Sequence, residues 1–306
     1  MRGWLRTYIL HSCLRAISES ENTQEAIIDS PKNMSEIDPL YVAQDYSKFV
    51  PFTARMMAAM RARETSREDR LFNDPFAAKL AGEDAFQQVD LQLTSQDQAY
   101  VAVRTRFFDD FLAGSTIGQV VLLASGLDTR AYRFPWTPEV EVYELDHPEV
   151  LAYKADLLKN TNPSCKHRLI AADLTQPWED KLLSAGYSPT SPSIWLIEGL
   201  LMYLSEAQVH VLLESVSNLS THGSQLGVDL INVKALEYEP YKGYFQFGAD
   251  TPEKLLSHYG WQAEVTQPGE ESANFGRFIE SSPPHEVPDV MRVFLVKANK
   301  IDVGRC

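Results

Sequence analysis

Apolar runs and amphipathic segments alternate along the chain after residue 118. The short apolar runs are typical of buried β-strands, and the segments between them carry apolar residues at helical spacing. The predicted strands span residues 120–123, 140–145, 168–172, 193–197, 225–230, 261–265 and 291–296, and the predicted helices span residues 149–159, 206–219 and 252–258. Strands that alternate with helices form a parallel sheet covered on both faces. The pattern therefore predicts an α/β fold.

The first third of the chain has helical patterns only. Residues 53–63 are rich in Ala, Met and Arg, and residues 98–112 are amphipathic; an Asp74-Pro75 break lies between them, followed by a helix to Leu80. Residues 19–38 are polar and resemble a linker. We expect a flexible extension over residues 1–38 and a single domain over 39–306, in which a helical cap (about 39–115) precedes an α/β core (about 116–300).

Composition narrows the possible functions. The 306 residues carry a formal net charge of −14, which argues against a nucleic-acid partner. Three widely spaced cysteines predict a reducing, cytoplasmic setting and no structural metal site, and no apolar run is long enough for stable membrane association. Residues 1–16 are basic and apolar, which is compatible with a targeting helix, although we favour a non-essential tail.

Acids follow four successive predicted strands. Asp128 lies just beyond the first, and Asp146, Asp173 and Glu198 end the next three. Each alone is best explained as a helix N-cap, but four in succession indicate a ligand site, because the carboxyl ends of parallel strands line one crevice.

The turn after the first strand limits the choice of cofactor. Ala124, Ser125 and Gly126 end this strand, and Asp146 follows Gly126 by twenty residues, which is typical of a nucleotide-binding unit. A dinucleotide fingerprint would need glycines where Ala124 and Thr129 stand, so NAD is the weaker hypothesis. No phosphate-binding P-loop and no GxSxG nucleophile motif occur. A nucleoside cofactor without phosphates fits best, and an NAD-linked oxidoreductase remains the alternative.

Several blocks of sequence resemble one known family. Over roughly residues 53–296 the chain is similar to the S-adenosylmethionine-dependent methyltransferases of the leucine carboxyl methyltransferase superfamily, closest to its bacterial and fungal O-methyltransferase-like branch. The blocks, in order, are TARMMAAMRARET with DRLFNDPFAAKLAG, VAVRTRFFDDFL, QVVLLASGLDTRAYRF, VYELDHPEVLAYKADLL, DLTQPW and WLIEGLLMYLSEAQVHVLL. The resemblance implies a Rossmann-like class I methyltransferase fold, with seven strands, an antiparallel last strand, helices on both faces and a helical cap.

The resemblance also implies roles for particular residues. Arg104 would hold the methionine carboxylate of S-adenosylmethionine, Glu198 would face its amino group, and Tyr203 would lie near the methyl group. The other implied contacts are the turn Ala124, Ser125, Gly126 and Asp128 under the methionine and ribose, Asp146 at the ribose hydroxyls, and Asp173 with Leu174 at the adenine. The chain departs from the family where Ala124 replaces a glycine. The family's cap also supplies a basic residue, which the spacing does not identify.

The implied reaction is methylation of an oxygen, on a carboxylate or hydroxyl of a small molecule. A carboxylate is already ionised at neutral pH, whereas an alcohol or phenol would need a base. His147 is a candidate base, but we favour a core or capping role for it. An aromatic insertion at residues 238–247 suggests a lid over a closed pocket. A carboxyl methyltransferase acting on protein C-termini would need an open cleft, so it is the weaker alternative. A cofactor-binding protein without catalysis is a further alternative.

Overall fold

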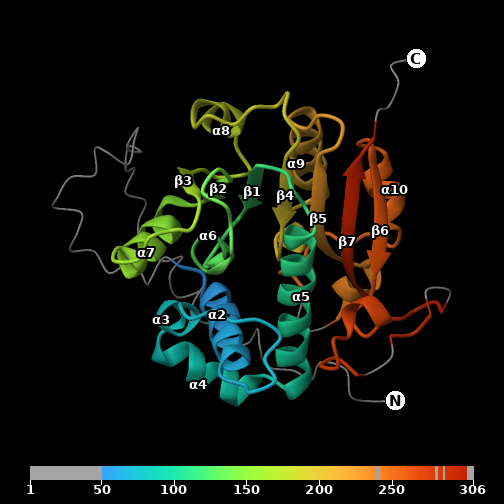
Figure 1. Ribbon diagram of the computed structural model, residues 1–306. Coiled ribbons are helices and arrows are strands. Elements are labelled where there is room, and N and C mark those ends of the chain that lie inside the picture. Colours follow the sequence, from blue (N-terminus) through green and yellow to red (C-terminus); the bar gives the residue numbers. More distant parts are fainter. Residues whose placement is uncertain (1–49, 239–241, 280–281, 285–286, 302–306) are drawn as a thin grey trace, which may run out of the picture.

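The computed structural model describes residues 50–238, 242–279, 282–284 and 287–301, and the predicted 1–38 extension lies outside them. Seven strands form one sheet in the order β3-β2-β1-β4-β5-β7-β6 (Figure 1). Strand β7 alone runs opposite to the other six strands. The strands are β1 (Gln119–Leu123), β2 (Glu141–Asp146), β3 (Lys166–Ala171), β4 (Ile194–Ile197), β5 (Gln225–Ile231), β6 (Trp261–Thr266) and β7 (Val293–Lys300). The predicted seven-stranded class I fold is confirmed.

Both faces of the sheet are buried under helices. Side chains alternate along β1, so Val121 and Leu123 enter one core while Val120 and Leu122 enter another. The first core includes α8 (Glu179–Ser184), α9 (Glu206–Asn218) and α10 (Pro252–Ser257), and the second includes α5 (Ser95–Ala113). This double cover explains why the central strands are apolar throughout rather than alternating. No helix among the described residues is both long and apolar enough to cross a bilayer.

Sequence signals fix where the main helices begin. Thr94 caps α5 and Ser205 caps α9, each in a reciprocal capping box with the residue three positions later. Pro148 occupies the first turn of α7 (Pro148–Leu158), where its missing N–H costs nothing. The chain therefore leaves the ends of β2 and β4 in defined directions, which positions the strand-end residues.

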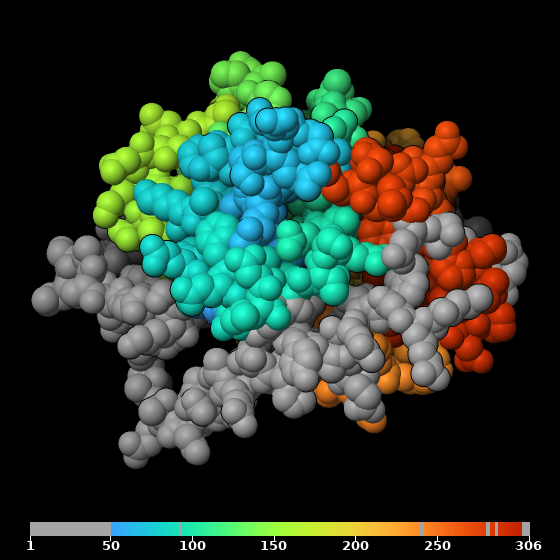
Figure 2. Space-filling view, turned by 90° about the horizontal axis from the view of Figure 1, so that it is seen from below, coloured from blue at the N-terminus to red at the C-terminus, as the bar shows by residue number. Residues whose placement is uncertain are grey.

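Three helices gather beyond the carboxyl ends of the strands. They are α2 (Phe52–Thr65), α3 (Ala77–Ala81) and α4 (Glu83–Gln92), and they bury small and apolar residues such as Ala58 and Ala59 against one another. Their core also takes in Leu127 and Leu158, from beyond β1 and from α7, so the helices are anchored to the α/β core. Viewed from below, α2 to α5 occupy the centre of the face, between the α7 region and the segment after β6 (Figure 2).

Two kinds of element differ from the sequence prediction. Helices α4 and α8 were not predicted, because α8 has only six residues and α4 carries few apolar positions. Strand β7 runs to Lys300, past the apolar run, since pairing with β5 and β6 on both sides holds its polar end extended. The remaining helical pieces are α6 (Arg130–Arg133), η4 (Leu201–Tyr203), η5 (Val233–Glu237) and η6 (Glu271–Ala273).

Candidate active site

A pocket of about 700 Å³ lies between the strand ends and the cap helices. Its walls come from the turn after β1, the ends of β2 to β4, helices α2 and α5, and the segments around η4 and before β7. All ten residues predicted from the sequence lie on its wall: Arg104, Ala124, Ser125, Gly126, Asp128, Asp146, Asp173, Leu174, Glu198 and Tyr203. Residues from five parts of the chain are thus brought together.

The turn after β1 has an unusual backbone. Ala124 has φ 50° and Gly126 has φ 51°, so two residues out of three adopt the left-handed conformation. Gly126 tolerates the left-handed conformation, whereas for an L-residue such as Ala124 this conformation costs roughly 1–2 kcal/mol. The Ser125 amide donates to the Leu145 carbonyl (3.1 Å), which ties the turn to the end of β2. A glycine at position 124 would avoid this strain.

Asp146 supports this turn from the end of β2. Its two carboxylate oxygens accept hydrogen bonds from the amides of Gly126 (2.6 Å) and His147 (2.7 Å). Burial raises the pKa of Asp146, although these two hydrogen bonds oppose the rise. Each carboxylate oxygen has two lone pairs, so Asp146 retains acceptor capacity toward the pocket.

Asp173 and Leu174 form the wall beyond β3. The Asp173 Oδ1 accepts from the backbone amide (2.8 Å) and hydroxyl (2.7 Å) of Thr175. Burial works against the charged form, but these bonds outweigh it and lower the pKa of Asp173. Both bonds use one oxygen, so the other can accept from a ligand beside Leu174.

Arg104 lies between two acids, Glu198 just after β4 and Asp229 within β5. Its Nη1 donates to Asp229 Oδ2 (2.9 Å), and its Nε lies 3.0 Å from Glu198 Oε1. Asp229 also accepts from the Gly199 amide (2.6 Å). Burial disfavours the charged Arg104, but Tyr100, Glu198 and Asp229 outweigh it, so the pKa of Arg104 is raised. Burial also raises the pKa of Asp229, although Arg104 opposes it.

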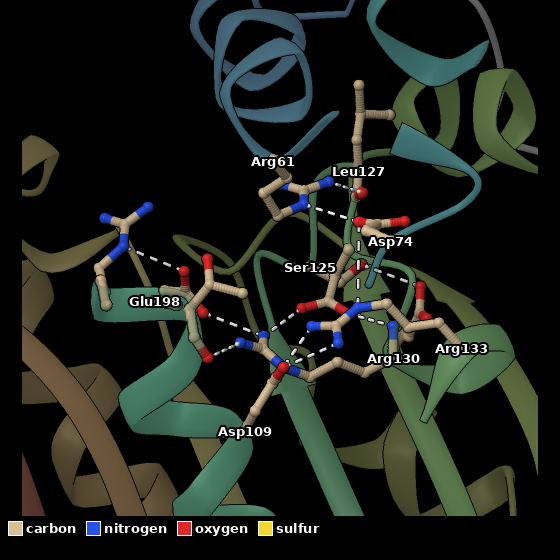
Figure 3. Close-up of polar contacts among 12 residues, drawn as sticks. Arg61, Asp74, Asp109, Ser125, Leu127, Arg130, Arg133 and Glu198 are labelled. Atoms are coloured by element: carbon tan, nitrogen blue, oxygen red, sulfur yellow. Dashed lines mark hydrogen bonds and ion pairs between the residues drawn. The ribbon is translucent and has the colours of Figure 1, made fainter. Parts of the chain in front are cut away.

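A second arginine, Arg130, connects two of the predicted acids. Its side chain is 2% exposed; Nε donates to Asp109 Oδ1 (2.8 Å), and Nη1 contacts Asp128 and donates to Glu198 Oε2 (3.0 Å). Glu198 is therefore held between Arg104 and Arg130. Figure 3 shows its contact with Arg130. Burial opposes the charged form of Asp128, but Arg130 and Arg133 outweigh it and lower the pKa of Asp128 to about 2.

The same network reaches the cap. Arg133 donates to both oxygens of Asp109 (2.7 and 2.8 Å) and lies 3.9 Å from Asp74. Arg61 of α2 donates to Asp74 Oδ2 (2.9 Å) and to the Leu127 carbonyl (2.6 Å), as Figure 3 shows. Arg61 is the one arginine of α2 that lines the pocket. Arg61 is therefore the candidate for the basic cap residue that spacing alone left open.

A third charged cluster lies behind the turn. Lys154 of α7 and Glu144 of β2 are both fully buried and form an ion pair, and the other Glu144 oxygen lies 3.1 Å from His167 Nε2. Burial opposes the charged form of Glu144, but Lys154 and His167 outweigh it and lower the pKa of Glu144. The three residues do not line the pocket.

The opposite side of the pocket is mainly apolar. Tyr203 lies edge-to-face with Phe245, with ring centroids 5.1 Å apart, and is 42% exposed. The chain around Phe245 is tied to η4, because the Gln246 amide donates to the Met202 carbonyl (2.7 Å). Other apolar residues that line the pocket are Met57, Ile231, Ala235, Phe278 and Met291. The described part of the predicted aromatic insertion therefore lies at the pocket.

Sequence reasoning missed several residues that organise this site. Asp229 is a buried acid in the otherwise apolar strand QLGVDLI, which is a detectable signal. Arg130 stands inside the recognised block but was given no role. His147 occupies the N-cap position of α7, as the capping alternative predicts, although its side chain makes no capping bond. It is exposed at the pocket, so the core alternative is wrong.

A family model now decides the relationship. The model described as "Leucine carboxyl methyltransferase" matches residues 54–217, which include the cap helices, the turn after β1 and the ends of β1 to β4. This chain belongs to the leucine carboxyl methyltransferase family. The resemblance predicted from six sequence blocks is confirmed, and S-adenosylmethionine-dependent methyl transfer is confirmed at the level of the family.

Individual relatives agree with this family. A protein of Mycolicibacterium gilvum named "Putative S-adenosyl-L-methionine-dependent methyltransferase" is 37% identical over 76% of this chain and 89% of its own length. A similarly named protein of Parafrankia sp. is 42% identical over 58% of this chain, and the match spans 62% of that relative.

Two solved structures share the fold. A DUF574 family protein from Streptomyces avermitilis has a TM-score of 0.56 at 13% identity, covering 81% of this chain and 97% of its own. A Thermobifida fusca protein named "putative methyltransferase" has a TM-score of 0.50 at 19% identity, covering 81% of this chain and 94% of its own. At such low identity these structures support the fold alone.

Proposed function

We propose that this member of the leucine carboxyl methyltransferase family transfers a methyl group from S-adenosylmethionine to an oxygen of a small molecule, either a carboxylate or a hydroxyl. The observation that carries the proposal is the convergence of all ten predicted residues on one pocket that is acidic at the strand ends and apolar opposite. A volume of about 700 Å³ is within the range of small-molecule sites, about 300–1,000 Å³.

The donor set fits a nucleoside cofactor that has no phosphates. Asp146 has acceptor capacity left for the ribose hydroxyls. The second oxygen of Asp173 can accept from the adenine amino group, and Leu174 can pack against the adenine ring. A dinucleotide would place its pyrophosphate at the turn, where glycines are needed for close approach and this chain has Ala124 and Thr129. This donor set disfavours the NAD-linked alternative.

The methionine end of the cofactor would lie near Glu198 and the two arginines. Arg104 is already neutralised by Glu198 and Asp229, but its Nη2 makes only a weak 3.7 Å contact with Met57 Sδ among the described residues. This group can therefore donate to the methionine carboxylate, while Glu198 accepts from the amino group. Arg61, from the cap, is a second candidate donor.

When bound, S-adenosylmethionine would supply a methyl group attached to a positively charged sulfonium. Once the methyl group is transferred, the rest of the cofactor is a neutral thioether. The protein's contribution is to hold the acceptor oxygen in line with the bond between the methyl group and sulfur, and to exclude water. The apolar residues around Tyr203 and Phe245 favour the exclusion of water. An ionised carboxylate needs no base at neutral pH, since its pKa is about 4.3. The family description also favours a carboxylate acceptor.

The proposal is tested in two steps. Calorimetry with S-adenosylmethionine and with NAD should show binding of the first only. Transfer of a labelled methyl group to pools of apolar carboxylic acids, phenols and alcohols should then label one pool, and mild base would release the label from a carboxyl ester but not from an ether. Binding of NAD in place of S-adenosylmethionine would contradict the proposal.

A further inference from the structure

Lys154 is a buried cation that the proposed reaction does not use. Its side chain is completely buried in the second turn of α7, and it does not line the pocket. A buried ammonium is costly unless all its donors are paired. Its position directly behind the turn after β1 therefore requires an explanation.

The three donors of Lys154 go to groups that hold that turn. Nζ pairs with the Glu144 carboxylate, donates to Asp128 O (3.2 Å), and lies 3.4 Å from Ser125 Oγ. Ser125 in turn donates to Glu144 Oε2 (3.3 Å). One side chain thus contacts both ends of the 125–128 segment and ties them to β2.

The turn needs such support because of Ala124. With φ at 50°, Ala124 would relax to an ordinary conformation if the neighbouring residues allowed it, and this rotation would move Ser125 and Gly126. A glycine at the same position would have no such tendency. The hydrogen bond from the Gly126 amide to Asp146 would be lost in the same movement.

We propose that Lys154 is a positioning residue that holds residues 124–128, called here the cofactor turn, in its binding conformation against the strain at Ala124. This inference rests on the proposed function, because the turn is taken to lie under the cofactor. Lys154 itself touches no ligand. Its effect passes through Ser125, Asp128 and Glu144.

The test removes the cation without leaving a buried charge. Lys154→Met alone would strand Glu144, so the variant is Lys154→Met/Glu144→Gln, whose amide can still bond to Ser125 and His167. We expect S-adenosylhomocysteine to bind about tenfold more weakly by calorimetry, equivalent to about 1.4 kcal/mol. The matched control is Lys300→Met, which removes a lysine that donates to the Tyr259 carbonyl (2.7 Å) far from the pocket. It should lower stability without changing affinity.

A second background separates positioning from general destabilisation. If Lys154 acts against strain, the same double substitution should cost less than threefold in affinity when Ala124→Gly is also present. An equal loss in both backgrounds, or no loss in the first, would overturn the proposal.

A measurement without ligand keeps the inference separate from the proposed function. Amide hydrogen exchange of the peptide spanning residues 119–130 should be faster in the double variant than in the wild type or Lys300→Met. Adding Ala124→Gly to the double variant should make this exchange slower than in the double variant alone. Unchanged exchange would refute the support by Lys154. Failure of the wild type to bind S-adenosylhomocysteine would refute the proposed function instead.

Discussion

The two sides of the pocket are built in different ways. The side at the strand ends is charged, and its acids are held by buried arginines, with Glu198 between Arg104 and Arg130. The opposite side is made of apolar side chains such as Met202 and Phe245, held by packing and a few backbone hydrogen bonds. Buried ion pairs are geometrically exacting, whereas apolar walls tolerate substitution when volume is kept. We infer that the charged side is constrained by the geometry of its ion pairs, and the apolar side by packing and by the shape of the acceptor.

Removing a buried ion pair from the charged side should therefore have the largest effect on the free energy of unfolding. Arg130→Met would leave Asp109, Asp128 and Glu198 without their common partner in a buried setting. Removal of one partner from a buried ion pair costs roughly 3–5 kcal/mol. We expect urea unfolding to show a loss of that size, together with weaker binding of S-adenosylmethionine.

The control for this variant is an exposed arginine. Arg67 is 48% exposed and pairs with Asp69 on the surface. Arg67→Met should cost about 0–1 kcal/mol, as is usual for surface pairs. Similar losses for Arg67→Met and Arg130→Met would remove the distinction between a constrained side and a tolerant one.

Asp146→Ala should weaken cofactor binding strongly, with a smaller effect on the fold. It removes the charge-assisted acceptor for the Gly126 and His147 amides as well as for the ribose hydroxyls. The expected loss is about 3 kcal/mol, or on the order of 100-fold in Kd by calorimetry. Asp146→Asn keeps one oxygen acceptor and should lose less. The exposed Asp180→Ala is the control, and unchanged affinity in Asp146→Ala would refute the ribose assignment.

The charged side could be predicted from sequence because its residues follow the strands directly. Asp146, Asp173 and Glu198 are placed by the ends of β2, β3 and β4, and parallel strands bring those ends together. Their partners were harder to predict. Arg130 bonds to Asp109, which is 21 residues away, and Arg104 bonds to Asp229, which is 125 residues away, so only the fold brings these pairs together.

The apolar side could not be predicted in the same way. Its residues come from α2, η4, η5 and the segments before β7, and each is an ordinary hydrophobic residue in its local sequence. Aromatic and methionine side chains are as common in cores as in binding pockets, so no local pattern distinguishes the two. Tyr203 was an exception only because it belongs to a recognised block.

Acid should weaken the charged side through Asp128. Its pKa is lowered to about 2 in the folded protein, against about 3.9 when unfolded, so its contribution to stability is present above pH 4 and is lost as pH falls toward 2. The difference corresponds to roughly 2–3 kcal/mol. Asp128→Asn should show a correspondingly flatter decline in stability over that interval. If the free energy of unfolding, measured with urea, fell as steeply between pH 4 and 2 in Asp128→Asn as in the wild type, the ion pair with Arg130 would be contradicted.

The smallest expected effect lies on the apolar side and tests whether the two sides are independent. Phe245→Ala removes the edge-to-face contact with Tyr203 but keeps the backbone hydrogen bond from Gln246 to Met202. Aromatic pairs contribute about 0.5–1.5 kcal/mol, so we expect up to about a tenfold rise in KM for the acceptor found in the labelling assay. The Kd for S-adenosylmethionine and the unfolding free energy should change little. Val211→Ala, at an exposed position on α9, is the control. A parallel loss of cofactor affinity in Phe245→Ala would mean that the apolar wall also shapes the charged side, and the division between them would fail.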